Sequence, residues 1–334
     1  MDIIAKLAEE LSVKPWQVEN TVKLIDDGNT IPFIARYRKE LTGELSDTIL
    51  RDLNERLTYL RSLENRKAEV IRLIDGQGKL TDELQASIEK AEVLQEVEDL
   101  YRPYKQKKRT RATIAKERGL EPLADIIWKQ ECQPTALEEI ARKFINEELG
   151  VLTAQDAING ASDIIAELIS DNAEFRKEIR ELTFRNGTIV AKGTKEEKSE
   201  YQMYYDFSEP VNRIAPHRIL AVNRGEKEEF LNIKVEAPED RILTYLKNKT
   251  VIENSPYKEV LETIVKDAYG RLVAPSIERE IRNELTDIAE EQAIKVFAAN
   301  LRNLLLQAPI KGKIVMGFDP AFRTGCKIAV VDDT

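Results

Sequence analysis

The sequence predicts a mainly α-helical fold with small β excursions. Apolar residues recur at three- and four-residue steps through most of residues 1–180, which is the spacing of one helix face. A second helical stretch begins at residue 276 and contains neither Gly nor Pro before Pro309. Short alternating apolar segments, typical of strands, stand out only at residues 183–193, 230–235 and 313–331.

Composition narrows the class of protein. The chain has 334 residues, enough for roughly two domains. Its net charge of −9 argues against general coating of nucleic acid or of an anionic membrane. No apolar run is as long as the roughly 18 residues that a membrane-spanning helix needs, and residues 1–10 lack the pattern of a signal peptide. The two cysteines, Cys132 and Cys326, fit a reducing compartment, so we expect a cytoplasmic protein.

The chain begins with two predicted helices and a short turn. Ile3, Leu7 and Leu11 mark the first helix, and Pro15 suits the first turn of the second, which ends before Gly28. This is the outline of a possible helix-turn-helix. The polar face of the second helix is nearly neutral, whereas a DNA-reading helix carries more cations, so a plain helical hairpin is favoured.

Two further helices follow. Ser46 is a good N-cap with Asp47 in the first turn, and Thr81 starts another helix that we expect to continue to Leu100. The helix after Ser46 extends to Gly76 and carries a leucine stripe that we expect to form core or a helix–helix seam: Leu50, Leu53, Leu57 and Leu60.

The segment from Arg102 to Arg118 inverts the charge of this acidic chain. Its only acid is Glu117, and Tyr101 and Tyr104 are interleaved with its cations. Cations with interleaved aromatic rings suit phosphate pairing, base stacking and cation–π contact. The residues that we predict to contact nucleic acid are Tyr104, Lys105, Lys107, Lys108, Arg109 and Arg111.

A structural role for the same cations is the alternative. They could pair with acids of neighbouring helices and hold the helices together, because acids are plentiful just upstream: Glu92, Glu96, Glu98 and Asp99. The sequence leaves both interpretations open.

Strand signals are few. Asn186-Gly187 lies between β-forming residues and predicts a two-stranded hairpin, and Leu231, Ile233 and Val235 predict one short strand. The single histidine, His217, excludes a multi-histidine metal site. We expect it to be a structural residue or a helix N-terminal group rather than a catalyst.

The last predicted helix is the longest. Pro275 precedes it, Ser276 is its expected N-cap, and its length of about 45 Å suits either a connecting spacer or a long core helix. Residues 314–316 and 328–331 then predict two strands joined by a turn. Because a hairpin alone is marginal in water, we expect its domain to continue with further elements.

Several blocks resemble the Tex family of bacterial transcription accessory proteins. The resemblance runs from the first helices to the last residue, in Pro32-Phe-Ile-Ala-Arg-Tyr-Arg-Lys-Glu-Leu-Thr-Gly43, Asp99-Leu-Tyr-Arg-Pro-Tyr-Lys105, Lys108-Arg-Thr-Arg-Ala-Thr-Ile-Ala115, Gly119-Leu-Glu-Pro-Leu-Ala124, His217-Arg-Ile-Leu-Ala-Val-Asn-Arg-Gly-Glu226 and Gly317-Phe-Asp-Pro-Ala-Phe-Arg-Thr-Gly325.

The resemblance implies a larger, nucleic-acid-binding protein. Such proteins continue into a YqgF domain of RNase H-like fold, helix-hairpin-helix elements and a C-terminal OB-fold RNA-binding domain. It implies these parts of the chain: a helical Tex-type region at 1–200, a mixed α/β segment at 201–274, a connecting helix at 275–308 and the start of the YqgF domain at 313–334.

The resemblance also gives Asp319 a position. It matches the first-strand Asp that helps to hold Mg²⁺ in RNase H-like nucleases. One carboxylate does not make a two-metal site, so we expect no catalytic residue, metal or other cofactor in this chain. The alternatives are the front half of a Mg²⁺-dependent, resolvase-like nuclease and a pure protein–protein docking arm.

We therefore predict a non-enzymatic scaffold region of a transcription-associated, nucleic-acid-binding protein. The expected partners are nucleic acid, RNA before DNA, and proteins of the transcription machinery. Neither a membrane nor a small-molecule substrate is expected.

Overall fold

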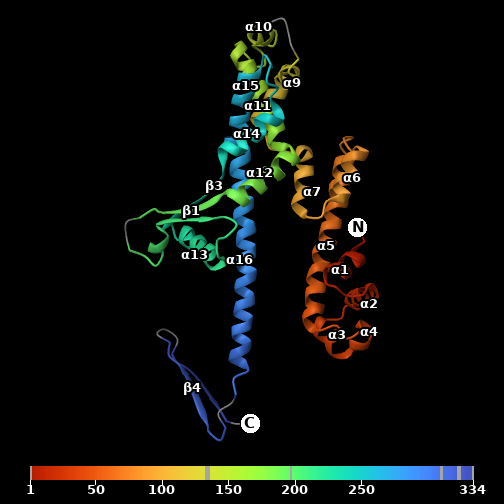
Figure 1. The fold of residues 1–334 in the computed structure, drawn as a ribbon, viewed down its shortest axis with the longest axis vertical. Coiled ribbons are helices and arrows are strands. Elements are labelled where there is room, and N and C mark those ends of the chain that lie inside the picture. The colour runs from red at the N-terminus through yellow and green to blue at the C-terminus, as the bar shows by residue number, and fades with distance from the viewer. Residues whose placement is uncertain (1, 132–135, 196–197, 309–310, 322–324, 333–334) are drawn as a thin grey trace. The chain divides into compact units, whose positions relative to one another are not determined.

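The computed structural model describes residues 2–131, 136–195, 198–308, 311–321 and 325–332 and is mainly helical, as predicted (Figure 1). The chain forms two compact units, Met1–Thr183 with Pro238–Ile277, and Phe184–Ala237 with Glu278–Thr334. Cys132 lies outside the described residues, and Cys326 is an exposed free thiol.

The first unit begins with four short helices beside one long helix (Figure 1). They are α1 (Ile3–Glu10), α2 (Pro15–Asp26), α3 (Ile31–Tyr37), α4 (Lys39–Thr42) and α5 (Asp47–Asp75). Ser46 caps α5 as predicted, because its hydroxyl accepts a hydrogen bond from the Ile49 amide at 3.2 Å. The predicted leucine stripe is core. Leu53, Leu57 and Leu60 pack with Leu7 and Val18, and Leu50 packs with Ile34 and Leu45.

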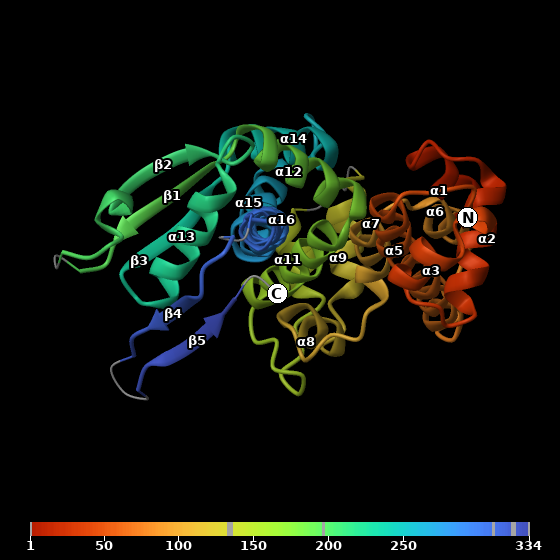
Figure 2. The same cartoon turned by 90° about the horizontal axis from the view of Figure 1, so that it is seen from below.

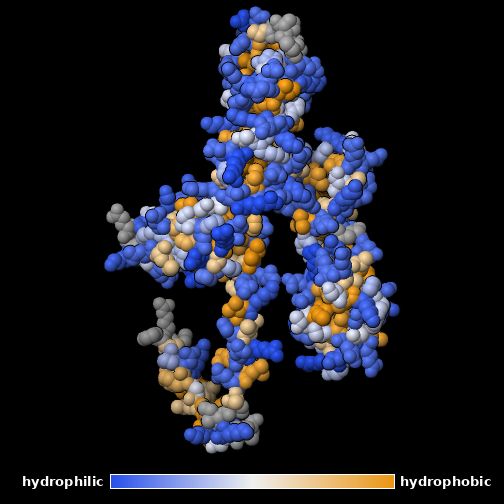
Figure 3. Space-filling model, viewed as in Figure 1, coloured by the Kyte–Doolittle hydropathy of each residue, from blue (hydrophilic) through white to orange (hydrophobic). Residues whose placement is uncertain are grey.

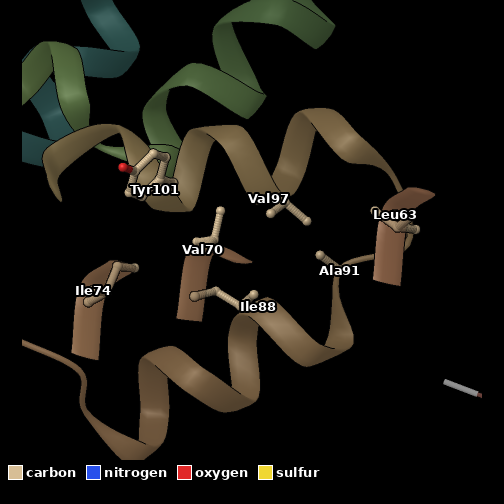
Figure 4. Packing of buried hydrophobic residues seen from close by; sticks show 7 residues of the cluster. All are labelled: Leu63, Val70, Ile74, Ile88, Ala91, Val97 and Tyr101. Atoms are coloured by element: carbon tan, nitrogen blue, oxygen red, sulfur yellow. The ribbon is translucent and has the colours of Figure 1, made fainter. Parts of the chain in front are cut away.

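Two helices pack on the second half of α5. Thr81 caps α6 (Asp82–Lys90), as predicted. The helix does not continue to Leu100, because the non-helical backbone of Ala91 ends it, and a separate helix, α7 (Leu94–Tyr101), follows. Figure 4 shows the core that the three helices share, which consists of Leu63, Val70, Ile74, Ile88, Ala91, Val97 and Tyr101. Full burial of a Leu, Ile or Val side chain stabilises a fold by about 1.5–3 kcal/mol, so this core holds the end of α7 in place.

The remainder of the first unit surrounds α11. Its elements are η1 (Arg102–Tyr104), α8 (Arg111–Glu117), α9 (Glu121–Lys129), α10 (Leu137–Arg142), α11 (Ala154–Asp171), α14 (Glu239–Thr250), α15 (Lys258–Asp267) and the π-helical segment η3 (Ala268–Val273). Gly160 on α11 faces the buried Leu120, whose Cδ1 would lie 2.3 Å from an added Cβ. The absence of a side chain therefore lets α11 pack closely against the start of α9.

The prediction of a hairpin turn at Asn186-Gly187 is wrong. Helix α12 (Ala173–Asn186) continues through Asn186, because Phe175, Ile179 and Thr183 are buried on one of its faces. Burial of this face overrides the local turn preference. Strand β1 (Thr188–Gly193) is instead the centre of an antiparallel sheet, with β2 (Asp206–Pro210) on one edge and β3 (Leu231–Glu236) on the other.

The sheet of the second unit has its own small core. Figure 2 shows α13 (Pro216–Lys227) beside the strands, and the 3₁₀ turn η2 (Gln202–Tyr204) precedes β2. Ile189, Ile219, Val222, Ile233 and Leu285 line one common space between the sheet, α13 and α16 (Ala274–Leu305). Leu231 and Ile233 are buried on one face of β3, as the alternation predicted. His217 is exposed in the first turn of α13.

The long helix α16 is present, but its start differs from the prediction. Ser276 is not an N-cap, because η3 passes into α16 without a break and leaves no free amide for it to cap. Its hydroxyl instead accepts a hydrogen bond from Arg176 Nη2 at 3.1 Å. The side chains of Ile281, Leu285 and Ala289 are buried, whereas the apolar residues from Ile294 to Leu306 are exposed (Figure 3).

The described chain ends in a hairpin of β4 (Val315–Asp319) and β5 (Lys327–Val331), in the register Gly317↔Ala329. These are the two strands that the sequence predicted. Both carry exposed apolar side chains, among them Met316, Phe318, Ile328 and Val330. None of the described helices is both long and apolar enough to cross a membrane.

Candidate nucleic-acid interface

The basic segment connects two anchored helices. The Tyr104 carbonyl, at the end of η1, accepts a hydrogen bond from Gln77 Nε2 at 2.9 Å, and the Tyr104 side chain packs on the core of α5–α7. Thr110 caps α8: its hydroxyl accepts from the Thr113 amide at 3.1 Å and donates to Glu167 Oε1 at 3.1 Å. Residues 105–109 therefore form a short loop whose two ends are fixed.

Two of the cations in this segment tie the loop to α11. The Lys107 ammonium forms a hydrogen-bonded ion pair with Asp171 and lies 3.4 Å from Glu167. Arg102 Nε lies 3.4 Å from Asp171 Oδ1. Burial raises the pKa of the Asp171 carboxyl, and the hydrogen bond from Lys107 opposes that shift. Lys107 is thus half-buried and serves the fold in this structure.

The acids just upstream of the segment have other partners. None of the ion pairs of the described residues joins them to the basic loop: Glu92 pairs with Lys6, Glu96 with Lys177, Glu98 with Arg66, and Asp99 with Arg176 and Arg180. The carboxylates that do meet the loop are Glu167 and Asp171 on α11. Sequence reasoning missed both. Their i, i+4 spacing shows that they share a helix face, but no local signal says what packs there.

The other cations of the loop, and Arg111 at the start of α8, face solvent. Lys105, Lys108 and Arg111 are exposed, and none of them has an ion-pair partner among the described residues. Arg109 Nη2 lies 3.6 Å from Glu117, with the two side chains 74% and 63% exposed. Such a surface pair contributes about 0–1 kcal/mol and leaves Arg109 available to another anion. We call Lys105, Lys108, Arg109 and Arg111 the loop cations.

Asp319 is the residue that the family resemblance linked to a metal ion. Among the described residues, no group of three or more His, Cys, Asp or Glu side chains is arranged to hold a metal ion. Asp319 is exposed at the end of β4 and pairs in register with Lys327 on β5. A single exposed carboxylate beside a cation is not a two-metal centre.

These features define the class: a helical scaffold that carries an exposed basic loop on an otherwise acidic chain. The Tex-like protein N-terminal domain model matches residues 1–75, and the Tex central region-like model matches residues 133–297. The chain belongs to the Tex family.

Curated relatives agree with that family. The uncharacterized protein YdcI of Bacillus subtilis is 52% identical and aligns with 98% of this chain and 46% of its own length. The transcriptional accessory protein Tex of Neisseria gonorrhoeae is 42% identical, over 100% of this chain and 45% of its own. The human S1 RNA-binding domain-containing protein 1 is 30% identical and aligns with 100% of this chain and 35% of its own length. The chain spans less than half of the length of these relatives.

Proposed function

We propose that this chain is a non-enzymatic scaffold region of a cytoplasmic transcription accessory protein and that its loop cations contact the phosphates of RNA. The observation that carries the proposal is a set of exposed cations, three of them without a carboxylate partner in the described structure, in a chain whose acids outnumber its cations by 60 to 51. Phosphate groups of a nucleic acid would supply the missing anions.

The contacts that fix the backbone of the loop support the same function. Lys107 and Arg102 hold the backbone against α11, and Thr110 fixes the start of α8. Lys105, Lys108 and Arg111 therefore project from a backbone that is ordered before any ligand arrives. Pre-organisation lowers the entropy that binding must remove, so a few phosphate contacts can suffice.

RNA and the transcription machinery are proposed from relatives. A gonococcal relative is named a transcriptional accessory protein, and a human relative is named for an S1 RNA-binding domain. We extend these functions to the protein that contains this chain, with DNA as a second ligand. In the same proposal α16 is the connecting helix, and β4–β5 begins a YqgF domain of RNase H-like fold.

The first prediction concerns the loop cations. In the triple variant Lys105→Glu, Lys108→Glu, Arg111→Glu we expect binding of single-stranded RNA to weaken by more than about tenfold at low salt. The slope of log affinity against log salt should fall by about 2, since each phosphate contact to a single strand contributes about 0.7. Fluorescence anisotropy across a salt series, with labelled RNA and duplex DNA, measures both quantities.

A charge-matched control separates contact from net charge. Lys90, Lys143 and Lys266 are exposed and have no ion-pair partner among the described residues. Their triple change to Glu alters the net charge equally and should leave the salt slope unchanged. If the loop variant is folded by circular dichroism and yet binds like the control, the loop cations do not contact nucleic acid, and the region is instead a protein-docking arm.

A further inference from the structure

We propose that α3 and α4 form a second contact surface, which binds single-stranded nucleic acid through phosphates and stacked bases. The surface consists of four consecutive exposed residues, and we call it the α3–α4 surface: Arg36, Tyr37, Arg38 and Lys39. It belongs to the first unit, beside the start of α5 (Figure 1). The inference shares a ligand class with the loop cations but does not depend on them.

The cations of this surface take no part in the ion pairs of the described residues. None of Arg36, Arg38 and Lys39 has an ion-pair partner among the described residues. Their neighbours differ: four arginines of α5 each pair with a carboxylate, namely Arg51, Arg56, Arg61 and Arg66. Three of these four consecutive residues are cations without an ion-pair partner in the described structure, and together they create a local positive potential.

Aromatic rings lie among these cations. Tyr37 is 65% exposed, and its ring centroid lies 5.3 Å from that of Phe33. The Arg38 guanidinium carbon lies 5.1 Å from the Phe33 centroid. A flat guanidinium and an exposed tyrosine ring are both surfaces on which nucleobases stack.

Core packing and hydrogen bonds from α2 fix the backbone of this surface. Ile34 anchors α3 in the core with Leu45 and Leu50. Two side chains of α2 donate hydrogen bonds to backbone carbonyls at the end of α4. Gln17 Nε2 donates to Thr42 O at 3.2 Å and to Gly43 O at 3.0 Å. Asn20 Nδ2 donates to Leu41 O at 2.9 Å. The exposed side chains therefore extend from an ordered backbone, which lowers the entropic cost of binding a flexible strand.

A single strand fits this surface better than an acidic peptide or a duplex. An acidic peptide would satisfy the cations but would leave the tyrosine ring in water. A duplex keeps its bases stacked inside, so it offers phosphates alone. Only a single strand presents both phosphates, which the cations can pair with, and free base faces, which can stack on the exposed Tyr37 ring.

The test uses the 334-residue chain and labelled strands of about twelve nucleotides, within the usual site size of such surfaces. The probes are oligouridylate, oligothymidylate and an abasic strand of equal length. We expect Arg36→Gln, Arg38→Gln, Lys39→Gln to weaken binding of the two strands that carry bases by about tenfold at low salt, with a shallower salt slope. Tyr37→Ala should weaken the same strands about tenfold and leave the abasic strand unchanged, whereas Tyr37→Phe should bind as the parent does.

Each outcome decides the proposal. A folded Arg36, Arg38, Lys39 variant with unchanged affinity and slope would overturn the α3–α4 surface, whatever the loop variant does. Equal losses for Tyr37→Ala on normal and abasic strands would overturn stacking. Binding of a polyglutamate peptide that the same variant abolishes, without an effect on any strand, would assign the surface to an acidic protein. The loop variant and the α3–α4 variant are measured separately, so one function can fail without the other.

Discussion

Asp99 joins three elements of the first unit through buried charge. Its carboxylate accepts hydrogen bonds from Arg176 Nε at 2.9 Å and from Arg180 Nη2 at 2.8 Å, and Arg176 also donates to Ser276. The Arg176 side chain has no solvent exposure, and that of Asp99 has 5%. Charges buried to this extent are tolerable only together, because each compensates the lost hydration of the other.

Removal of that carboxylate is the prediction at the residue scale. Asp99→Asn should lower the free energy of unfolding by about 3–5 kcal/mol, because it removes the buried negative charge to which both guanidinium groups donate hydrogen bonds. Urea denaturation followed by circular dichroism measures the change. Arg61→Gln is the control: its pair with Asp26 is exposed, so the loss should be below about 1 kcal/mol. Equal losses in the two variants would show that the buried cluster does not stabilise the unit.

The turn after α4 decides how the α3–α4 surface is mounted. Gly43 has φ 65°, in the left-handed region that disfavours side chains. An added Cβ would also lie 2.5 Å from Cη2 of Trp16 and 2.7 Å from Nε2 of Gln17. Gly43 thus allows the left-handed turn that ends α4, and it leaves room for the Trp16 and Gln17 side chains of α2 beside that turn.

A pair of glycine substitutions separates these two effects at the element scale. Gly78 has a similar φ of 67° but open space around it, so Gly78→Ala should lower the free energy of unfolding by only about 1 kcal/mol. Gly43→Ala should lower it by more than twice as much, since Trp16 must also move. It should also change tryptophan fluorescence in a Trp128→Phe background. Identical effects of the two substitutions would mean that the Trp16 contact is unimportant.

The whole chain carries carboxylates whose ionised form the fold favours. The hydrogen bond from Arg56 lowers the pKa of Glu10, that from Arg61 lowers the pKa of Asp26, and that from Lys177 lowers the pKa of Glu96. Depressed folded-state pKa values mean that this stabilisation is present above the unfolded-state pKa and is lost as the pH falls through the folded-state value. The pKa of Asp171 is shifted in the opposite direction, because burial raises it.

The prediction at the scale of the whole molecule is therefore acid lability. The free energy of unfolding should decrease between about pH 5 and pH 3, as these three carboxylates gain protons. Urea midpoints across this range measure the decrease. In Arg56→Gln, Arg61→Gln the decrease should be smaller, because Glu10 and Asp26 then titrate near their unfolded-state values. An unchanged pH dependence in that variant would exclude these pairs as its cause.

The helices of this protein are largely determined by local sequence. Ser46 and Thr81 cap the helices that the sequence predicted, and the leucines after Ser46 are buried on one face. Both signals act within a few residues, since a cap bonds an amide three positions away and a stripe follows the helical period. The charge inversion at Arg102–Arg118 is likewise visible in the sequence alone.

Only the tertiary structure decided which cations the fold uses and which it leaves exposed. Lys107 and Lys108 are neighbours, yet Lys107 pairs with Asp171, 64 residues further along the chain, while Lys108 faces solvent. Burial of one helix face likewise extended α12 through Asn186, and Ser276 lies inside a continuous helix. Charge, turn and capping patterns describe what a residue can do. Its partner depends on which distant element packs beside it, and that is a property of the folded chain.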